Sequence, residues 1–188
     1  MAENKTRTPP KFVYNCVRCG QYCSSVKDVS VTFADINRWR KNGTLASMSQ
    51  HIGMNMEGGY PKLVLESKEN ETGCPMYDLE NKNCQIYHDM PLNCQAYPLN
   101  FNGEKYFVTD KACKGLGEGE MTAEQLKLQR NAAREDYEAR IESNTLVPLM
   151  YSIIMGNLVE QSRKAMENMS DEQKAQLQDM IHEEEDET

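Results

Sequence analysis

The amino-acid sequence predicts an α+β fold in two parts, a small metal-organised Cys-rich module with short strands followed by an α-helical C-terminal region. All seven cysteines of the 188-residue chain lie within residues 16–113, where the sequence is rich in loops and turns. From residue 121 the pattern changes to long segments with apolar stripes at helical spacing. We therefore divide the chain into a flexible lead (1–11), a Cys-rich module (12–120) and a helical region with an acidic tail (121–188).

The first part of the module contains signals for a strand and a helix. Residues 29–31 alternate in polarity like a strand. Thr32 and Asp35 have the spacing of a capping box that opens a helix, and Gly43 is a stop signal for it. Residues 43–61 are rich in Gly, Met and Ser, and we expect them to be mostly loop.

Further along the module, residues 62–66 are predicted to form a strand. Residues 80–83 are predicted to form a turn directly before Cys84. Residues 99–108 are predicted to form a hairpin, because Asn102 and Gly103 make a strong turn signal between two apolar runs.

The seven cysteines form one pattern of the metal-ligand type. A thiolate is a soft ligand that binds Zn²⁺ tightly or holds an iron–sulfur cluster, and closely spaced thiolates can bind one metal from a single turn. Because this segment has few aliphatic residues, we expect metal coordination to organise it and to bring the cysteines together. The candidate ligands are Cys16, Cys19, Cys23, Cys74, Cys84, Cys94 and Cys113.

The number of thiols leaves the kind of site open. Seven thiols exceed the four ligands of a structural zinc site, so either two metals share them or one cluster takes four and the others have another role. His88 is the histidine best placed to join, although a loop histidine bonded to the backbone is the simpler interpretation. We rank a [4Fe–4S] cluster above zinc, because aromatic residues that could shield a cluster lie near the cysteines. They are Tyr14, Tyr22, Tyr77, Tyr87 and Tyr97.

Composition and charge exclude several classes of protein. The net charge is −8, and it belongs to residues 121–188, because residues 1–120 contain equal numbers of acidic and basic side chains. Nucleic acid is therefore not an expected partner. The longest apolar run, 145–159, is too short and too interrupted to span a membrane. With no secretory signal we expect a cytoplasmic protein. In the reducing cytoplasm, clustered cysteines indicate metal chemistry more often than disulfides.

The helical region contains three predicted helices, at about 122–143, 148–168 and 170–183. The second is apolar nearly all round, so we expect it to be buried on several sides, in part by a partner protein. The first has a capping box at Thr122 and Gln125. It also carries an apolar stripe of Leu126, Ala133, Tyr137 and Ile141.

Five cysteine motifs follow one another along the module. They are Cys16-Val-Arg-Cys19-Gly-Gln-Tyr-Cys23, Cys74-Pro75, Cys84-Gln-Ile-Tyr87, Pro91-x2-Cys94 and Cys113-x-Gly115-x-Gly117. Their order resembles the YkgJ-type cysteine-cluster family of zinc- or iron-chelating domains over about residues 12–119. The resemblance implies metal binding, and it reaches the flagellin lysine methylases, which carry this cysteine motif within much longer chains. Two positions depart from the family pattern, with Tyr22 in place of a cysteine and Met90 in place of an arginine.

We therefore expect a metal-binding protein, not catalytic by itself, that carries an iron–sulfur cluster or zinc. It would act as an accessory or redox-responsive subunit that docks on a partner protein through its C-terminal helices. Two alternatives stay open, a structural zinc module of an interaction protein and a redox enzyme or methyltransferase-related protein. The enzyme alternative needs a general base, and the sequence nominates no catalytic residue.

Overall fold

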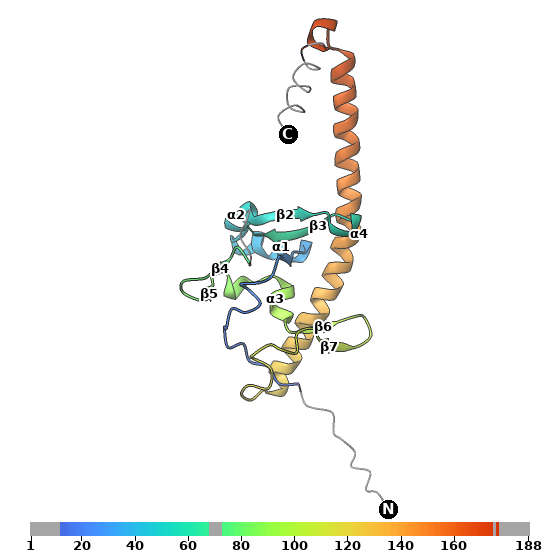
Figure 1. Ribbon diagram of the computed structural model, residues 1–188. Helices are drawn as coiled ribbons and strands as arrows, with labels where there is room; N and C mark the ends of the chain where they lie inside the picture. The colour runs from blue at the N-terminus through green and yellow to red at the C-terminus, as the bar shows by residue number, and fades with distance from the viewer. Residues whose placement is uncertain (1–11, 68–72, 175, 177–188) are drawn as a thin grey trace, which may run out of the picture. The chain divides into compact units, whose positions relative to one another are not determined.

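The structure is a computed structural model that describes residues 12–67, 73–174 and 176, and it confirms the α+β architecture (Figure 1). Short strands form small antiparallel sheets, and one long helix, α4 (Ala123–Glu167), follows them. The chain divides into two units, one up to Val147 and one from Pro148. The first unit therefore includes the beginning of the helical region. Among the described helices, none is both long and apolar enough to cross a membrane.

The main core lies against a three-stranded antiparallel sheet. Its strands are β1 (Asp28–Ser30), β3 (Lys62–Glu66) and β2 (Ile52–Asn55), with β3 in the middle. Val29 of β1 lies opposite Leu65 of β3, and both side chains are buried. The strands expected at 29–31 and 62–66 are confirmed within a residue. The buried members of this core are Val29, Val31, Trp39, Met48, Leu65 and Met76.

The prediction that residues 43–61 are mostly loop is wrong. Ile52 pairs with Leu65 and Asn55 with Lys62, so this segment supplies the second edge of the sheet. The partner strand β3 lies beyond a turn, and the Gly- and Met-rich composition of residues 43–61 gives no strand signal. The segment contains α2 (Leu45–Met48), η1 (Ser49–His51), β2 and η2 (Glu57–Gly59).

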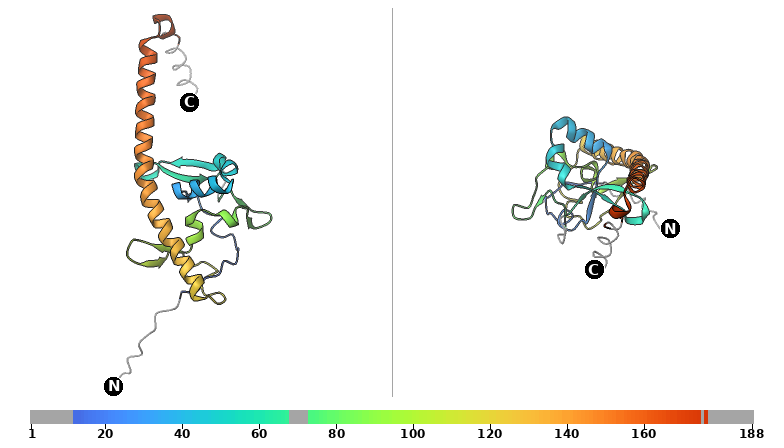
Figure 2. Two further views of the ribbon diagram at one scale, coloured as in Figure 1. Left: turned by 180° about the vertical axis from the view of Figure 1, so that it is seen from behind. Right: turned by 90° about the horizontal axis from the view of Figure 1, so that it is seen from above.

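Helix α1 (Phe33–Asn42) lies beside this sheet, and its predicted caps are confirmed (Figure 2). The Asp35 amide donates to the Thr32 hydroxyl at 3.2 Å, and the Asp35 carboxylate accepts from the Thr32 amide at 2.9 Å. These reciprocal bonds satisfy backbone donors that the first turn leaves free. Gly43 ends the helix with a left-handed φ of 79°, which glycine adopts without a Cβ clash.

The Asp35 carboxylate also joins α1 to α3 (Leu92–Ala96). Asp35 is fully buried, at 0% exposure. It accepts a hydrogen bond from the Leu92 amide at 2.8 Å and from the Arg38 guanidinium at 2.9 Å. The first amide of α3 would otherwise lack a partner, so one carboxylate caps two helices.

Asp89 fixes the neighbouring turn η3 (Tyr87–Asp89) to the same helix. Arg38 donates to its carboxylate at 3.2 Å, and Trp39 donates to its backbone carbonyl at 2.8 Å. The Thr44 hydroxyl donates to the other carboxylate oxygen. Helix α1 therefore holds both segments that flank Pro91.

Two small hairpins complete the module. In the first, β4 (Tyr77–Asp78) pairs with β5 (Asn83–Cys84), and Asp78 accepts backbone hydrogen bonds from the turn between them. In the second, β6 (Leu99–Phe101) pairs with β7 (Tyr106–Val108), and the Asn102 side chain closes its turn. The turn before Cys84 and the hairpin at 99–108 are both confirmed.

Helix α4 differs from the prediction in its length. The capping box is confirmed, because the Thr122 amide donates to the Gln125 side chain and the Gln125 amide donates to the Thr122 hydroxyl. However, the helix continues through Pro148 to Glu167, so the expected break between two helices is wrong. A proline removes one backbone donor but can be accommodated when the turns on both sides are helical. At the start of the third predicted helix, Ser170 exchanges capping hydrogen bonds with Gln173, and 171–174 and 176 are helical. Residues 175 and 177–183 of the predicted range lie outside the described residues.

The face that α4 buries is more polar than the predicted stripe. Ile141 is 51% exposed, whereas Ala133, Asp136 and Ser143 are buried. The Ser143 hydroxyl accepts from the Phe33 amide at 2.9 Å. The Gln129 amide donates to carbonyls at the end of α3, among them that of Ala96 at 2.6 Å. The predicted stripe is confirmed at Ala133, with Leu126 and Tyr137 partly buried, and it is wrong at Ile141. Polar side chains share this face because Ser143 and Gln129 bond backbone groups and Asp136 pairs with Arg140.

From Pro148 onward, α4 has almost no buried side chain. Within the described part of the chain no other residues bury this apolar segment, so its burial by a partner protein stays a prediction. Its exposed large apolar residues are Leu149, Met150, Ile153, Ile154, Met155, Leu158, Val159 and Met166.

We predict that Asp35→Ala lowers the free energy of unfolding by about 3–5 kcal/mol, because it leaves the Thr32 and Leu92 amides without their acceptor and removes one of the two carboxylates that pair with Arg38. Urea denaturation followed by circular dichroism measures this change. Asn37→Ala, on the exposed side of α1, is the matched control and should change the free energy by about 0.5 kcal/mol or less. Equal effects of the two substitutions would contradict the role given to Asp35.

Candidate metal centre

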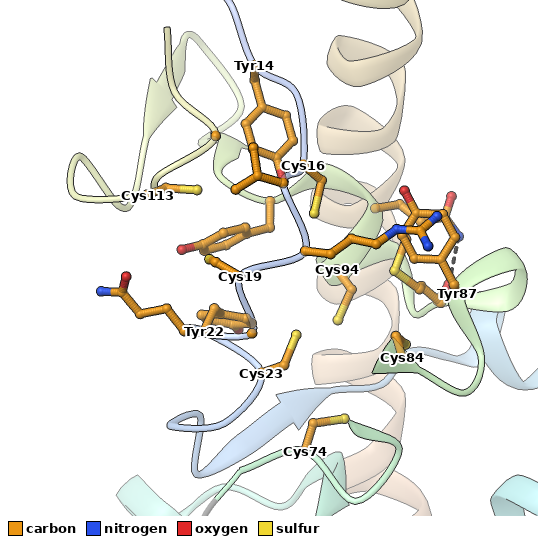
Figure 3. Close-up of a pocket in the computed structure, with 18 of the residues that line it drawn as sticks. Tyr14, Cys16, Cys19, Tyr22, Cys23, Cys74, Cys84, Tyr87, Cys94 and Cys113 are labelled. Atoms are coloured by element: carbon orange, nitrogen blue, oxygen red, sulfur yellow. Dashed lines mark hydrogen bonds between the residues drawn. The ribbon is translucent and has the colours of Figure 1, made fainter. Parts of the chain in front are cut away.

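All seven cysteines line one cavity of about 450 Å³ in the first unit (Figure 3). All of them are free thiols. The candidate ligands that the sequence spreads over almost a hundred residues therefore share one cavity. The segment before β1 supplies three, and separate later elements supply the others. The later four are Cys74, Cys84 on β5, Cys94 on α3 and Cys113 in the loop before α4.

Backbone hydrogen bonds bring three of these segments together at one end of the cavity. The Cys74 amide donates to the Cys23 carbonyl at 2.7 Å. Cys84 pairs with Tyr77 in the β4–β5 hairpin, which begins three residues after Cys74. The positions of Cys23, Cys74 and Cys84 relative to one another therefore follow from backbone pairing.

A second set of backbone bonds brings Cys113 close to the beginning of the module. Tyr14 and Leu116 form an isolated antiparallel bridge. The Asn15 amide donates to the Gly115 carbonyl at 3.0 Å. A Cβ at Gly115 would clash with the Asn15 carbonyl oxygen, so this close approach requires glycine. The loop that carries Cys113 thus lies beside the chain that leads into Cys16.

Among four of the cysteines, every pair interacts electrostatically. Burial, followed by the charges of Cys74, Cys84 and Cys16, raises the pKa of Cys23 to about 11. Burial raises the pKa of Cys94 well above its ordinary value, and the charges of Cys74, Cys23 and Cys84 add to this. The pKa of Cys74 is raised too, by burial and then by the charge of Cys84. Each member of the set Cys23, Cys74, Cys84 and Cys94 therefore lies close to the other three.

The other three cysteines have different surroundings. Cys16 and Cys19 are exposed, and Cys113 is partly buried. Burial, followed by the side chain of Cys16, raises the pKa of Tyr14, and burial, followed by Asp110 and then Cys113, raises the pKa of Tyr97. The sequence favours Cys16 and Cys19 as the knuckle of the main site, but in the structure they lie outside the set of four that is coupled in every pair.

Aromatic rings and cations form much of the remaining wall. All five tyrosines that the sequence singles out line the cavity. Tyr22 stacks on Tyr97 with 4.3 Å between ring centroids. The Arg18 guanidinium lies over the Tyr87 ring, 4.4 Å from its centroid, and Arg18 also lines the cavity. His88 is not among the lining residues, and its ring packs edge-on against Tyr87.

The side chains as they stand do not yet form a coordination shell. Within residues 12–67, 73–174 and 176, no three Cys, His, Asp or Glu side chains are grouped closely enough to hold a metal ion. The donor set, seven sulfurs with no histidine, fits zinc or an iron–sulfur cluster and does not fit a hard cation such as Mg²⁺.

Sequence reasoning missed two polar residues of the site. Asp110 accepts hydrogen bonds from the Tyr97 hydroxyl and from the Ala112 amide. Its position three residues before Cys113 is the one available signal, because Asp commonly bonds the backbone two residues on. Arg18 has a left-handed φ of 52°, and its location between Cys16 and Cys19 indicates a cation beside the thiols.

Comparison with known proteins supports the metal-ligand interpretation. The family model CxxCxxCC, described as a putative zinc- or iron-chelating domain, matches residues 15–114, which is more than half of the chain. This match confirms the resemblance to the YkgJ-type proteins. No solved structure matches the chain.

We predict that the metal-free, reduced protein loses stability as the pH rises from about 9 to about 11. The folded pKa of Cys23, about 11, is raised above the ordinary value of 9.0. Below about pH 9 the thiol is protonated in both states, so its contribution is fully present there. Above that value the unfolded chain releases its proton first, and the folded state loses free energy relative to it.

Urea denaturation at about pH 8 and about pH 10.5 checks the sign. The metal-loaded protein is the control, because its ligand thiolates have already lost their protons. A free energy of unfolding that is equal or larger at the higher pH in the metal-free protein would show that the thiols are not crowded in the folded state.

Proposed function

Because this chain belongs to the CxxCxxCC family of metal-chelating domains, we propose that it is a metal-binding accessory protein whose resident centre is held by four cysteines. These are Cys23, Cys74, Cys84 and Cys94. The centre is a [4Fe–4S] cluster in preference to Zn²⁺. When bound, such a cluster supplies one-electron transfer, whereas zinc would supply structural order alone.

The mutual coupling of these four thiols carries the ligand assignment. Each raises the pKa of others in the set or has its own pKa raised by them, and all six pairs are represented. Four thiolates is the number required both by a closed zinc site and by a [4Fe–4S] cluster. Their raised pKa values keep these thiols protonated in the metal-free protein, and a bound cation would stabilise the thiolate forms that burial and neighbouring thiolates disfavour.

The wall of the cavity favours the cluster over zinc. Five tyrosine side chains line it, and apolar shielding from solvent suits an iron–sulfur cluster. A cavity of about 450 Å³ is also far larger than a single zinc ion needs. The cation of Arg18, which lines the same cavity, would offset part of the negative charge of the thiolates.

Metal and sulfide analysis of protein purified without oxygen tests this proposal. We expect iron and acid-labile sulfide in equal amounts, with a broad visible absorbance that bleaches on reduction. Cys94→Ser should lose the iron, and Cys19→Ser is the matched control that should keep it, because Cys19 is exposed and outside the set of four. Stoichiometric zinc without sulfide would instead support the structural zinc module.

The apolar residues of the second unit support a docking role. Between Leu149 and Val159 the helix exposes large aliphatic side chains, and contiguous apolar surface of this kind marks protein–protein contact sites. None of the seven cysteines lies in this unit. We propose that this segment binds a partner protein while the first unit carries the metal.

Charge substitutions in the full chain test the docking role. Ile153→Glu together with Val159→Glu should abolish recovery of the partner protein with the tagged chain from its source cells, while the metal content stays unchanged. Ser152→Glu together with Asn157→Glu adds the same charge at polar positions of the same helix and should retain the partner. If the apolar variant retains the same partner, the docking role is wrong.

A further inference from the structure

Two arginines on the first part of α4 form a positive patch that has no part in the proposed metal centre. Arg130 and Arg134 lie one turn apart on this helix, and both side chains are exposed. We propose that these two guanidinium groups, together with the β6–β7 hairpin beside them, bind an acidic peptide segment of a partner protein. This inference goes beyond the proposed function, because it involves neither the cysteines nor the apolar segment after Pro148.

Aromatic contacts fix the hairpin on α4. The Phe101 ring of β6 meets the Tyr137 ring of α4 edge-on, with 5.5 Å between the ring centroids. Gly103 in the hairpin turn lies against the Tyr137 hydroxyl, and a Cβ at this glycine would come within 2.6 Å of that oxygen. The Tyr106 ring of β7 packs on Phe101 at 4.8 Å. The two rings of the hairpin are therefore held beside the first part of α4 (Figure 1).

The Tyr106 side chain brings the two guanidinium groups together. The central carbon of the Arg130 guanidinium lies 5.5 Å from the centre of the Tyr106 ring. Arg134 donates to the Tyr106 hydroxyl at 3.2 Å, and its central carbon lies 5.8 Å from the centre of the Phe101 ring. A guanidinium has five N–H donors in a planar fork, so both groups keep donors that can bind a carboxylate.

The positive charge of the patch has no acidic partner close by. Among the residues that the structure describes, neither Arg130 nor Arg134 forms an ion pair. Glu138 lies one turn beyond Arg134, but the Arg134 guanidinium bonds Tyr106 instead. Like charges one turn apart disfavour a helix. An external carboxylate between the two guanidinium groups would offset this repulsion.

The surroundings of the patch favour a peptide over a small anion or a nucleic acid. Neither arginine lines the cavity that contains the cysteines, so a small molecule would make few contacts here. Two more exposed cations extend the patch, Lys127 one turn before Arg130 and Lys105 next to Tyr106. Charges spaced in this way complement the carboxylates of an acidic segment. A nucleic acid carries its charge far beyond the patch, where the net charge of −8 would repel it.

Fluorescence anisotropy of the metal-loaded full chain, with a labelled hexaglutamate peptide as the probe, tests the inference. We expect saturable binding that weakens as the salt concentration rises. Arg130→Gln together with Arg134→Gln should weaken this binding by about tenfold or more, because hydrogen bonds between charged groups are lost. Tyr106→Phe keeps the ring but removes the hydroxyl that orients Arg134, and it should weaken binding by about threefold.

Arg40→Gln together with Lys41→Gln is the matched control, since it removes the same charge from exposed positions of α1. It should change the affinity by about twofold or less. An equal loss in this control would assign the binding to overall charge and overturn the inference. Absence of saturable binding, or equal affinity of the natural sequence and the Arg130, Arg134 variant, would overturn it as well.

Two further probes and one further variant complete the test. Hexaglutamine that binds as tightly as hexaglutamate would exclude recognition of carboxylates. A short single-stranded DNA that binds more tightly than the peptide, and is lost with the same arginines, would assign the patch to nucleic acid. Should the glutamine pair fail to fold, Arg130→Lys with Arg134→Lys keeps the charge and loses the planar fork. Undiminished peptide binding in that variant overturns the role of the guanidinium groups.

Discussion

The buried Asp35 carboxylate is the interaction on which the arrangement of the cysteine-rich module depends. It completes the cap of α1 through Thr32, pairs with Arg38, and accepts the first amide of α3 at Leu92. Burying a carboxylate costs several kcal/mol, and here four donors from two helices offset that cost. Cys94 lies two residues beyond Leu92, so the position of its thiol depends on the hydrogen bond between the Leu92 amide and the Asp35 carboxylate.

Burial of the thiols is the second constraint on the module. Hydrogen bonds and hairpins bring the cysteines to one cavity, where burial first, and then the neighbouring thiols, raise the pKa of Cys23 and of Cys94. The metal-free thiols therefore hold their protons more tightly than in an unfolded chain. Metal binding then releases protons and adds its free energy to that of folding.

Helix α4 changes its character where the two units meet in the sequence. Up to Val147 it buries small and polar side chains, of which Gln129 and Ser143 bond backbone groups of the module. After Pro148 it exposes large aliphatic side chains. One continuous helix thus contains a segment that packs on the cysteine-rich module and a segment whose apolar side chains are exposed.

The sequence by itself determined the elements that depend on near neighbours. The α1 caps at Thr32 and Gly43, the hairpin at Asn102 and Gly103, and the strand at 62–66 follow from local chemistry, and so does the family-type cysteine pattern. Tertiary structure decided the pairing of β2 with β3, the polar face of α4, and the division of seven thiols into a coupled four and an outer three. These features depend on partners far apart in the chain, and spacing alone cannot say which sulfurs meet, because their separation in space is set by buried hydrogen bonds such as those of Asp35.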